Sequence, residues 1–235
     1  YAIPLSITGA SNYSLIPSQR SAILLLNRSI LSSVAKVSGG EGIRIKPVGM
    51  HTKAEWTIQM SAIYSSLTRS NLTTAYLSNG TGGEFYTRIS STAGIQVKNG
   101  RDGDDTWTQI PLQAGKWLHI TYVHKDKKTT VYVNGKVQKV FENSAITFGE
   151  NSMIVVGNSG YRNDYLREIR LWDKALTESE INDYLYLPMD PATPHLISYL
   201  PLSKEMETKD LKAPAGTENV TTKARIEYVE NVKFP

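Results

Sequence analysis

The side chains that could do chemistry are few, and their spacing restricts what they could do. Cysteine is absent, and the only histidines are His51, His119, His124 and His195. The absence of cysteine excludes thiol nucleophiles, zinc thiolates and disulfides. No two histidines have metal-ligand spacing on one predicted element. That leaves carboxylate chemistry, cations bound by oxygen ligands, and ligand binding by aromatic and planar polar side chains.

One loop concentrates acidic side chains. Asp102, Asp104 and Asp105 lie in the Gly-rich segment 99–105, whose spacing begins like that of a calcium-binding loop. Gln113 stands where the closing glutamate of such a loop would be. A solvated acidic turn is therefore the favoured interpretation, and a calcium ion at Asp102 and Asp104 is the alternative. We expect no cofactor, with calcium as the one candidate.

Two loops carry the residue types that hold sugars. Sugar rings stack on flat aromatic faces, while their hydroxyls pair with planar polar groups such as those of Asn, Asp and Arg. For each aromatic residue the competing interpretation is packing at the end of a strand. The predicted ligand-binding residues are Tyr161, Arg162 and Asn163 in segment 157–165, and Trp107 and Asp105 in segment 104–107.

Short alternating segments separated by Gly and Asn recur along the chain. The predicted strands include residues 43–45, 55–64, 84–89, 117–123, 165–172, 195–200 and 224–229. Strands at this spacing, with almost no helical periodicity, indicate an all-β sandwich or barrel. Trp56, Trp117 and Trp172 are expected to lie in its core.

One helix is predicted, and it begins after Thr177. Thr177 and Glu180 form a capping box, in which the hydroxyl accepts the Glu180 amide and the carboxylate reaches back. Ile181 and Tyr184 share one face of the helix, and Pro188 ends the segment. Because the helix follows a strand, we expect it to cap the sandwich rather than form a second layer.

The Asn134-Gly135 pair lies between alternating β-branched and aromatic residues and predicts a β-hairpin. A two-residue loop would place Val133 opposite Lys136. A three-residue loop with a glycine bulge would place Val133 opposite Val137 and keep both on the buried face. Because a slip of one residue moves every side chain to the other face, the bulged loop is the predicted one.

Composition argues against two further classes of protein. The chain has 235 residues, a formal net charge of +4 and a pI of about 9.1. Its densest basic segment, 124–128, is interrupted by Asp126 and precedes a strand, so we predict no nucleic-acid binding. No apolar stretch approaches the length of a membrane span.

Four segments, in order along the chain, carry a family resemblance. They are residues 115–120 (GKWLHI), 131–136 (VYVNGK), 155–158 (VVGN) and 166–181 (LREIRLWDKALTESEI). Together they resemble the laminin G-like and pentraxin-like branch of the concanavalin A-like lectin/glucanase superfamily. The resemblance implies an all-β jelly-roll sandwich of two antiparallel sheets with one short capping helix, over residues 30–235. His119 lies at a position that resembles a structural histidine of the family, which is packed and hydrogen-bonded.

Residues 1–29 are predicted to be the C-terminal strands of a truncated upstream β domain, or a linker. Their opening stretch (YAIPLSI, residues 1–7) resembles the end of a small β domain of unknown function. That domain precedes laminin G-like modules in exported glycan-utilisation proteins of Gram-negative gut bacteria. The resemblance implies a lipoprotein at the outer surface or in the periplasm, peripheral to the membrane through an N-terminal anchor that this chain lacks.

The superfamily includes glucanases, so the acidic residues need a separate comparison. Retaining hydrolysis requires two carboxyl groups about 5 to 5.5 Å apart, which these glucanases supply from one strand as Glu-x-Asp-x-x-Glu. No glutamate in this chain is followed by an aspartate two positions later. After Glu168, Arg170 stands where the central carboxylate would be. We therefore expect no glucanase activity of that type.

The predicted function is a non-catalytic carbohydrate-binding module of an exported bacterial glycan-utilisation protein, with a glycan or polysaccharide as its partner. Two alternatives stay open. One is a protein–protein adhesion or structural laminin G-like module, because a fold does not fix a function. The other is a glycoside hydrolase with an unrecognised site. The sequence also leaves open whether a sugar binds at the loop rim or on the concave sheet.

Overall fold

The structure is a computed structural model. It describes residues 33–39, 42–67, 72–78, 85–99, 105–142, 146, 148–157, 162–185, 187–230 and 232. Only the backbone is described for residues 72–78 and for His51, Asn99, Asp105, Arg162 and Asn163.

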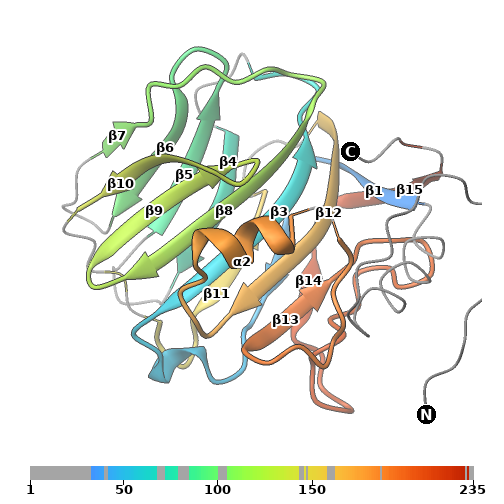
Figure 1. Cartoon of the computed structure of the whole chain (residues 1–235). Helices are drawn as coiled ribbons and strands as arrows, with labels where there is room; N and C mark the ends of the chain where they lie inside the picture. The colour runs from blue at the N-terminus through green and yellow to red at the C-terminus, as the bar shows by residue number, and fades with distance from the viewer. Residues whose placement is uncertain are drawn as a thin grey trace, which may run out of the picture.

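The described strands form two antiparallel sheets that stack face to face (Figure 1). In spatial order, sheet A consists of β10 (Lys136–Phe141), β9 (Lys128–Val133), β8 (Trp117–Lys125), β3 (Trp56–Ile63), β12 (Arg162–Trp172), β1 (Ser33–Ser38) and β15 (Arg225–Glu230), and β13 (Leu196–Leu200) also pairs with β12. Sheet B consists of β14 (Val220–Thr222), β2 (Ile43–Ile45), β11 (Met153–Val156), β4 (Leu72–Ser78), β5 (Phe85–Ser90), β6 (Gly94–Asn99) and β7 (Asp105–Trp107). The predicted all-β jelly-roll sandwich is confirmed.

Aromatic side chains from both sheets meet in the space between them. Trp56 of β3 and Phe85 of β5 pack edge to face with ring centroids 5.5 Å apart, and Phe85 meets Tyr122 of β8 in the same way at 5.6 Å. All three side chains are buried, together with the inward-facing aliphatic residues of every strand around them. Such pairs contribute about 0.5–1.5 kcal/mol each beyond the burial of their area. They therefore hold sheet A against sheet B.

The predicted helix is present as α2 (Glu178–Asp183) and lies across the outer face of sheet A (Figure 1). Its capping box forms as predicted, since the Thr177 hydroxyl accepts from the Glu180 amide and the Glu180 carboxylate accepts from the Thr177 amide. Ile181 is fully buried, and the Tyr184 ring stacks on Trp172 at 5.4 Å. Among the described residues, no helix has both the length and the apolar character needed to cross a bilayer.

Strand β12 carries a bulge that matters for the chemistry of sheet A. Its register with β3 shifts between Arg167 and Arg170, and Glu168 within the bulge has a positive φ of 56°. A bulge inserts an extra residue and re-aims the neighbouring side chains. As a result, Arg167 and Arg170, which are three positions apart, both pair with outer-face residues of β3, Ser61 and Gln59. The Arg170 side chain donates to the Glu168 carboxylate and to carbonyls of the segment that follows α2.

The β9–β10 hairpin differs from the predicted one. Val133 pairs with Lys136 across a two-residue turn, in which Asn134 and Gly135 have positive φ values of 51° and 75°. This mirror-image turn matches the natural twist of the strands. The bulge lies inside β10 instead, between Val137 and Lys139. The predicted three-residue loop is therefore wrong.

Two physical reasons explain the observed hairpin. First, β10 is the edge strand of sheet A, so Val137 remains 46% exposed and does not need to share the buried face. Second, the turn is anchored to β8, because the His119 backbone amide donates to the Asn134 side chain and the Asn134 amide donates to the His119 carbonyl. Both effects come from neighbouring strands and outweigh the local burial pattern.

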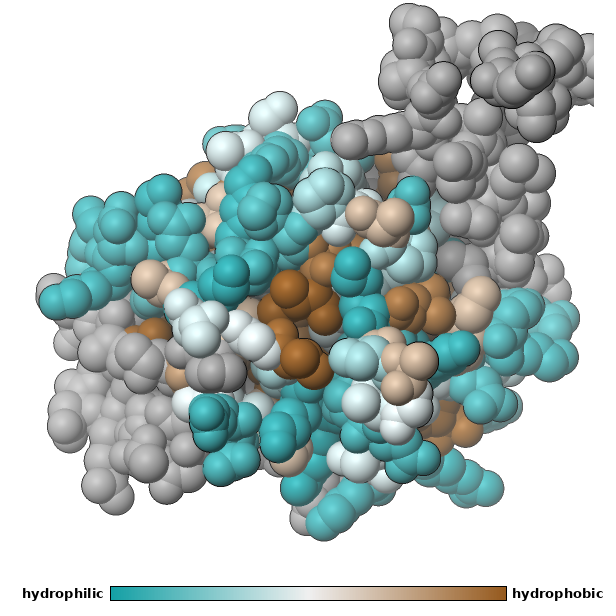
Figure 2. Space-filling view, turned by 90° about the horizontal axis from the view of Figure 1, so that it is seen from below, coloured by the Kyte–Doolittle hydropathy of each residue, from teal (hydrophilic) through white to brown (hydrophobic). Residues whose placement is uncertain are grey.

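The surface formed by the described residues carries few large apolar side chains. Seen from below, it is mostly hydrophilic, with a small hydrophobic group near its centre (Figure 2). The exposed large hydrophobic residues among those described are Val48, Ile110, Val137 and Val140. Single exposed apolar residues are normal on a soluble surface.

A substitution at Gly42 should be far more damaging than one at Gly39. Both glycines have positive φ values, 75° and 67°. A Cβ at Gly42 would overlap the backbone carbonyl oxygen of Val156, whereas nothing lies within 4 Å of a Cβ at Gly39. We expect Gly39→Ala to lower the free energy of unfolding by about 1–2 kcal/mol from backbone strain alone. Gly42→Ala should cost about 1–3 kcal/mol more, because β2 must move away from β11. Urea denaturation of both variants measures the difference, and equal losses would contradict the packing argument.

Candidate functional site on the outer face of sheet B

Cross-strand register aligns two rows of residues on the outer face of sheet B. Directly paired residues of antiparallel strands lie on the same face. The alternate residues of β5 and β6, such as Phe85 and Val97, belong to the core, so the residues that these two strands contribute to the rows face away from it. In spatial order the first row is Thr221, Arg44, Val155, Tyr76, Tyr86, Lys98 and Asp105. The second row includes Arg88, Gln96 and Trp107.

Tyr86 is the meeting point of two cations on this face. The guanidinium carbon of Arg88 lies 4.8 Å from the centroid of the Tyr86 ring, and Nζ of Lys98 lies 5.4 Å from it. Both distances are within the about 6 Å over which an aromatic ring attracts a cation. Nη1 of Arg88 also donates to Oε1 of Gln96 at 3.4 Å. A phenol ring, a guanidinium, an ammonium and an amide are thus grouped on two adjacent strands.

Trp107 extends this group to the edge of the sheet. It is half-buried in β7 and pairs in register with Gln96. Its backbone carbonyl accepts a hydrogen bond of 3.0 Å from Nζ of Lys139, which belongs to the edge strand β10 of the other sheet. The Lys139 ammonium also lies 5.2 Å from the centroid of the Phe141 ring. Lys139 therefore ties the edges of the two sheets together and fixes the strand that carries Trp107.

The structure does not bring the two predicted loop groups together. Trp107 lies in β7, at the edge of sheet B, whereas Arg162 opens β12 in sheet A, on the opposite side of the sandwich (Figure 1). The backbone places Asp105 in β7 and Asn163 in β12. The predicted residues Tyr161, Asp102 and Asp104, like the side chains of Asp105, Arg162 and Asn163, lie outside the described part of the chain.

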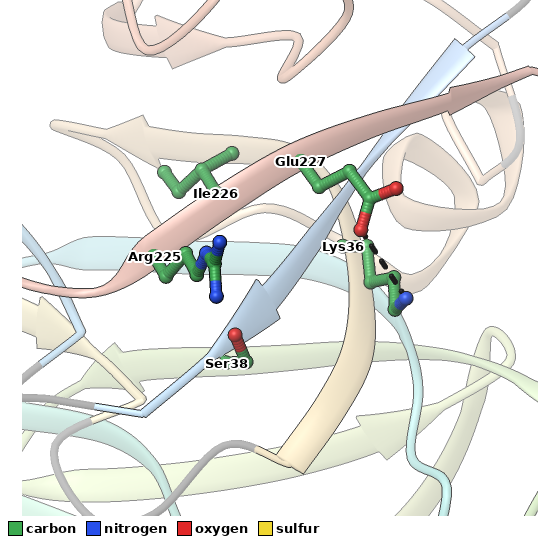
Figure 3. Close-up of a pocket in the computed structure, with 5 residues that line it drawn as sticks. All are labelled: Lys36, Ser38, Arg225, Ile226 and Glu227. Carbon is green, nitrogen blue, oxygen red and sulfur yellow. Dashed lines mark hydrogen bonds and ion pairs between the residues drawn. The ribbon is translucent and has the colours of Figure 1, made fainter.

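A hollow of about 500 Å³ lies on sheet A, at its β15 edge (Figure 3). Its described lining comes from β1 and β15 and holds no aromatic side chain: Lys36, Ser38, Arg225, Ile226 and Glu227. Nζ of Lys36 pairs with the Glu227 carboxylate at 3.3 Å, and the Arg225 guanidinium lies toward Ser38 (Figure 3). Ser38 is in register with both Arg225 and Arg162. The hollow therefore borders the start of β12, where the predicted ligand-binding segment 157–165 enters that strand. It offers a sugar polar partners and no stacking surface.

Sequence reasoning missed four of the five described residues on sheet B: Tyr86, Arg88, Gln96 and Lys98. A local signal for them existed, because residues 85–90 (FYTRIS) and 94–99 (GIQVKN) alternate apolar with polar or aromatic positions. That alternation assigns each residue to a face. What it could not give is the pairing of β5 with β6 that places Tyr86 opposite Lys98.

A protein-family model described as the concanavalin A-like lectin/glucanases superfamily matches residues 38–182. The chain belongs to this superfamily. The match covers the strands from the end of β1 to β12, including β5, β6 and β7, and reaches into α2. Among curated proteins, no relative matches the chain.

Several solved structures share the fold of this chain at low sequence identity. One is a protein of Bacteroides ovatus assigned to carbohydrate binding, with 19% identity and a TM-score of 0.63 over 85% of this chain and 60% of that chain. A second is domain 4 of AbnA, an extracellular arabinanase from Geobacillus stearothermophilus, solved with arabinotriose. It has 20% identity and a TM-score of 0.53 over 64% of this chain and 75% of that chain.

A third similar structure is the sialidase of Trypanosoma rangeli in complex with sialic acid. Its identity is 14% and its TM-score 0.51, over 63% of this chain and 26% of that chain. The chain therefore spans about a quarter of the sialidase and 60% of the Bacteroides protein. The likeness to these three structures extends to the fold alone.

Because most glycoside hydrolases need two opposed carboxyl groups, the hydrogen-bond partners of the buried acids matter. Among the described residues three carboxylates are buried, and the first two are Asp164 and Glu168. Oδ1 of Asp164 accepts from the backbone amide and the hydroxyl of Ser65, at 2.7 and 2.9 Å. Oε2 of Glu168 accepts from Nη2 of Arg170 at 2.7 Å and from the Tyr199 hydroxyl at 3.0 Å. Each carboxylate is thus engaged by protein donors.

The third buried carboxylate is Asp210. It accepts from the Ser198 hydroxyl at 2.6 Å, the Tyr199 backbone amide at 2.8 Å and the Asn219 side-chain amide at 2.6 Å. The Lys212 backbone amide also donates to it, at 2.9 Å, so four donors bind this carboxylate. Asp210 therefore joins β13 to the segment leading into β14. Within the described part of the chain, no three acidic or histidine side chains gather as metal ligands.

The outer face of sheet A is closed by the chain that follows α2. Arg170 is fully buried and donates to the backbone carbonyls of Tyr184, at 2.8 Å, and of Leu187. The Tyr199 hydroxyl accepts from the Met189 amide at 3.1 Å, and burial raises the pKa of this phenol far above its usual value. Arg170 and Tyr199, both of which bind the Glu168 carboxylate, thus hold Tyr184, Leu187 and Met189 against the sheet.

His119 belongs to this covered face of sheet A. It is fully buried, as predicted, and its Nδ1 lies 3.4 Å from the Thr121 hydroxyl. Burial, assisted by the positive charge of Arg170, lowers the pKa of His119 to about 3. The ring is therefore neutral at all pH values at which a catalytic histidine would change its charge.

The buried His119 should give the protein a measurable acid sensitivity. In the unfolded chain the pKa returns to about 6.5, so between pH 6.5 and 3 only the unfolded state takes up this proton. The free energy of unfolding is then lost as the pH falls, by up to about 1.4 kcal/mol per pH unit. We expect His119→Gln to have a shallower pH dependence of stability over this range. Urea titrations at several pH values measure it, and NMR of the His119 ring should show no titration above pH 5. Parallel stability curves for the two proteins would contradict the assignment.

Proposed function

We propose that this protein is a non-catalytic carbohydrate-binding module of an exported bacterial glycan-utilisation protein, and that it holds a glycan against the outer face of sheet B. The observation that carries the proposal is the grouping of Tyr86, Arg88, Gln96, Lys98 and Trp107 on one face of three adjacent strands. Aromatic rings beside planar polar groups are the partners that sugar rings and hydroxyls need.

Each member of this group has a distinct role in the proposal. Trp107 supplies the flat surface against which a sugar ring packs. Arg88 donates N–H groups to hydroxyl or ring oxygens, since only one of its donors is used by Gln96. Lys98 adds an ammonium donor, and Asp105, which holds the next register position on β7, accepts from hydroxyls.

The comparisons support the proposal without extending beyond the fold. Domain 4 of AbnA was solved with arabinotriose, and the Bacteroides ovatus protein is assigned to carbohydrate binding. An exported protein at the outer surface or in the periplasm of a Gram-negative bacterium fits such a role, and we include this location in the proposal. The engagement of Asp164, Glu168 and Asp210 by protein donors supports a module without catalysis.

We also propose a second, smaller contact with glycan at the predicted loop residues Tyr161, Arg162 and Asn163. Arg162 is in register with Ser38, which lines the hollow on sheet A. A hollow lined by polar groups would suit the end of a polysaccharide chain. This contact is separate from the site on sheet B, because the two lie on different sheets.

Removing the stacking surface should weaken binding strongly. We expect Trp107→Ala to lower the affinity for the best ligand of a glycan array by about tenfold, because a central aromatic anchor contributes more than about 1 kcal/mol. Val137→Ala is the matched control, since this apolar residue lies on the edge strand β10 of the other sheet. Isothermal titration calorimetry measures both variants.

Three other results of this experiment would redirect the proposal. Unchanged affinity in Trp107→Ala combined with a loss in Tyr161→Ala would move the sugar to the loop rim. No binding to any glycan would favour the protein–protein or structural module. Sugar release from a polysaccharide panel would identify a hydrolase.

We expect glycan binding to persist when calcium is removed. Gln113 occupies the closing position of the candidate calcium loop, which lacks the glutamate that usually completes such a site. Repeating the titration in EDTA, and then with added calcium, measures the dependence. Asp102→Asn combined with Asp104→Asn is the matched variant. A loss of binding both in EDTA and in this variant would assign a calcium ion to the loop.

A further inference from the structure

We propose that the site on sheet B selects anionic saccharides, and that Arg88 and Lys98 bind the carboxylate or sulfate group of such a sugar. This inference rests on the proposed function and names the ligand class of the same site. It comes from the charges of the described residues rather than from their aromatic character.

The first observation is that these two cations have no acidic partner among the described residues. Within the described part of the chain, neither Arg88 nor Lys98 forms an ion pair, and their contacts are to the Tyr86 ring and, for Arg88, to Gln96. Six other lysines among the described residues do form ion pairs, and none of them belongs to a strand of sheet B: Lys36, Lys53, Lys125, Lys128, Lys174 and Lys204. The ion pairs of the described lysines thus lie outside sheet B.

The second observation concerns the formal charges of the residues named in the two rows. Three of them are cationic, Arg44, Arg88 and Lys98, against one acidic residue, Asp105. Asp105 holds the register position beside Lys98, so even a full pairing of these two residues leaves Arg88. The formal charges of the named residues therefore sum to a positive value.

The third observation is that the Tyr86 ring is already in use. Two cations lie over it, at 4.8 and 5.4 Å, so it serves as their support rather than as a free surface for a sugar ring. The guanidinium and the ammonium are thus both held against the same ring. An anionic group bound beside this ring would receive charge-assisted hydrogen bonds from these cations, which are about twice as strong as neutral ones. The sugar ring itself would then reach the half-buried Trp107.

The hollow on sheet A is the competing basic site, and its charges are arranged differently. Lys36 is already paired with Glu227, which leaves Arg225 as the basic residue beside Ser38 (Figure 3). One free cation and a nearby carboxylate attract an anion less than two cations do. Arg225→Gln therefore separates the two sites experimentally.

The test compares charged saccharides with neutral forms of the same backbone. The probes are polygalacturonate and its methyl ester, alginate and its methyl ester, and dextran sulfate and dextran. We expect the tightest ligand to be a charged member, with at least about tenfold higher affinity than its neutral counterpart, and we expect this preference to shrink as salt rises. Uronate and sulfate members of the panel distinguish which anionic group is preferred.

Variants assign the preference to residues. Arg88→Gln and Lys98→Gln should each lower the affinity for the charged ligand by about fivefold, as expected for one partly exposed charge contact. Their effect on the neutral ligand should stay below about twofold. Lys125→Gln and Lys128→Gln are matched controls, because each removes a surface charge that is already paired, with Glu55 and Glu142 respectively.

Several outcomes would overturn the inference. Equal affinity for charged and neutral members would do so while leaving the proposed function intact. A loss in Arg225→Gln but not in Arg88→Gln would move the anion to the hollow. A DNA oligonucleotide bound as tightly as the best saccharide would indicate charge attraction without sugar recognition. Binding to no glycan at all would instead be a failure of the proposed function.

Discussion

The structure depends on one constraint, which is that alternate side chains of every strand must be buried between the two sheets. Trp56, Phe85 and Tyr122 fill the centre of that space and join the sheets through edge-to-face contacts. Once they are inside, the residues between them must point outward, because successive side chains of a strand alternate. The chemistry of both outer faces is therefore a consequence of how the core is filled. Tyr86 faces outward because its neighbour Phe85 is needed inside.

The outer faces of the two sheets differ in what covers their polar residues. Sheet A is closed by α2 and segment 184–189, and its polar residues serve that closure. Arg170 holds two backbone carbonyls and the Glu168 carboxylate, and His119 is kept neutral by burial. Breaking one partner of such a buried pair costs about 3–5 kcal/mol, so these residues are held to their structural role. Sheet B carries its polar and aromatic residues in a row that no described helix covers, and this difference directs the search for ligands to sheet B.

The sequence predicted the architecture well because the signals for it are local. The strands at residues 117–123, 165–172 and 195–200 and the capping box at Thr177 lie where alternation and turn residues put them. The hairpin register was wrong for a non-local reason. The predicted register required Val137 to be buried, but Val137 lies on an edge strand and remains partly exposed. In addition, the Asn134 side chain accepts a hydrogen bond from the His119 amide of β8, which fixes the turn.

The candidate site was predicted only in part, because most of its residues are brought together by pairing between strands rather than by their spacing along one strand. Trp107 was found because an aromatic residue stood beside acidic and glycine residues in one segment. Tyr86, Arg88 and Lys98 become a group only through the pairing of β5 with β6, which no residue spacing within either strand specifies. The division into residues 1–29 and 30–235 stays a prediction.

The grouping of cations on sheet B is unfavourable by itself, which is why it bears on function. Like charges repel each other, more strongly where water is partly excluded. Attraction to an aromatic ring contributes about 0.5–1 kcal/mol per exposed cation, so the contacts of Arg88 and Lys98 with Tyr86 offset part of their mutual repulsion. An arriving negative group meets both attractions at once and removes the repulsion. A sandwich whose core is this well filled can keep such a locally unfavourable arrangement, and proteins retain arrangements of this kind mainly at functional sites.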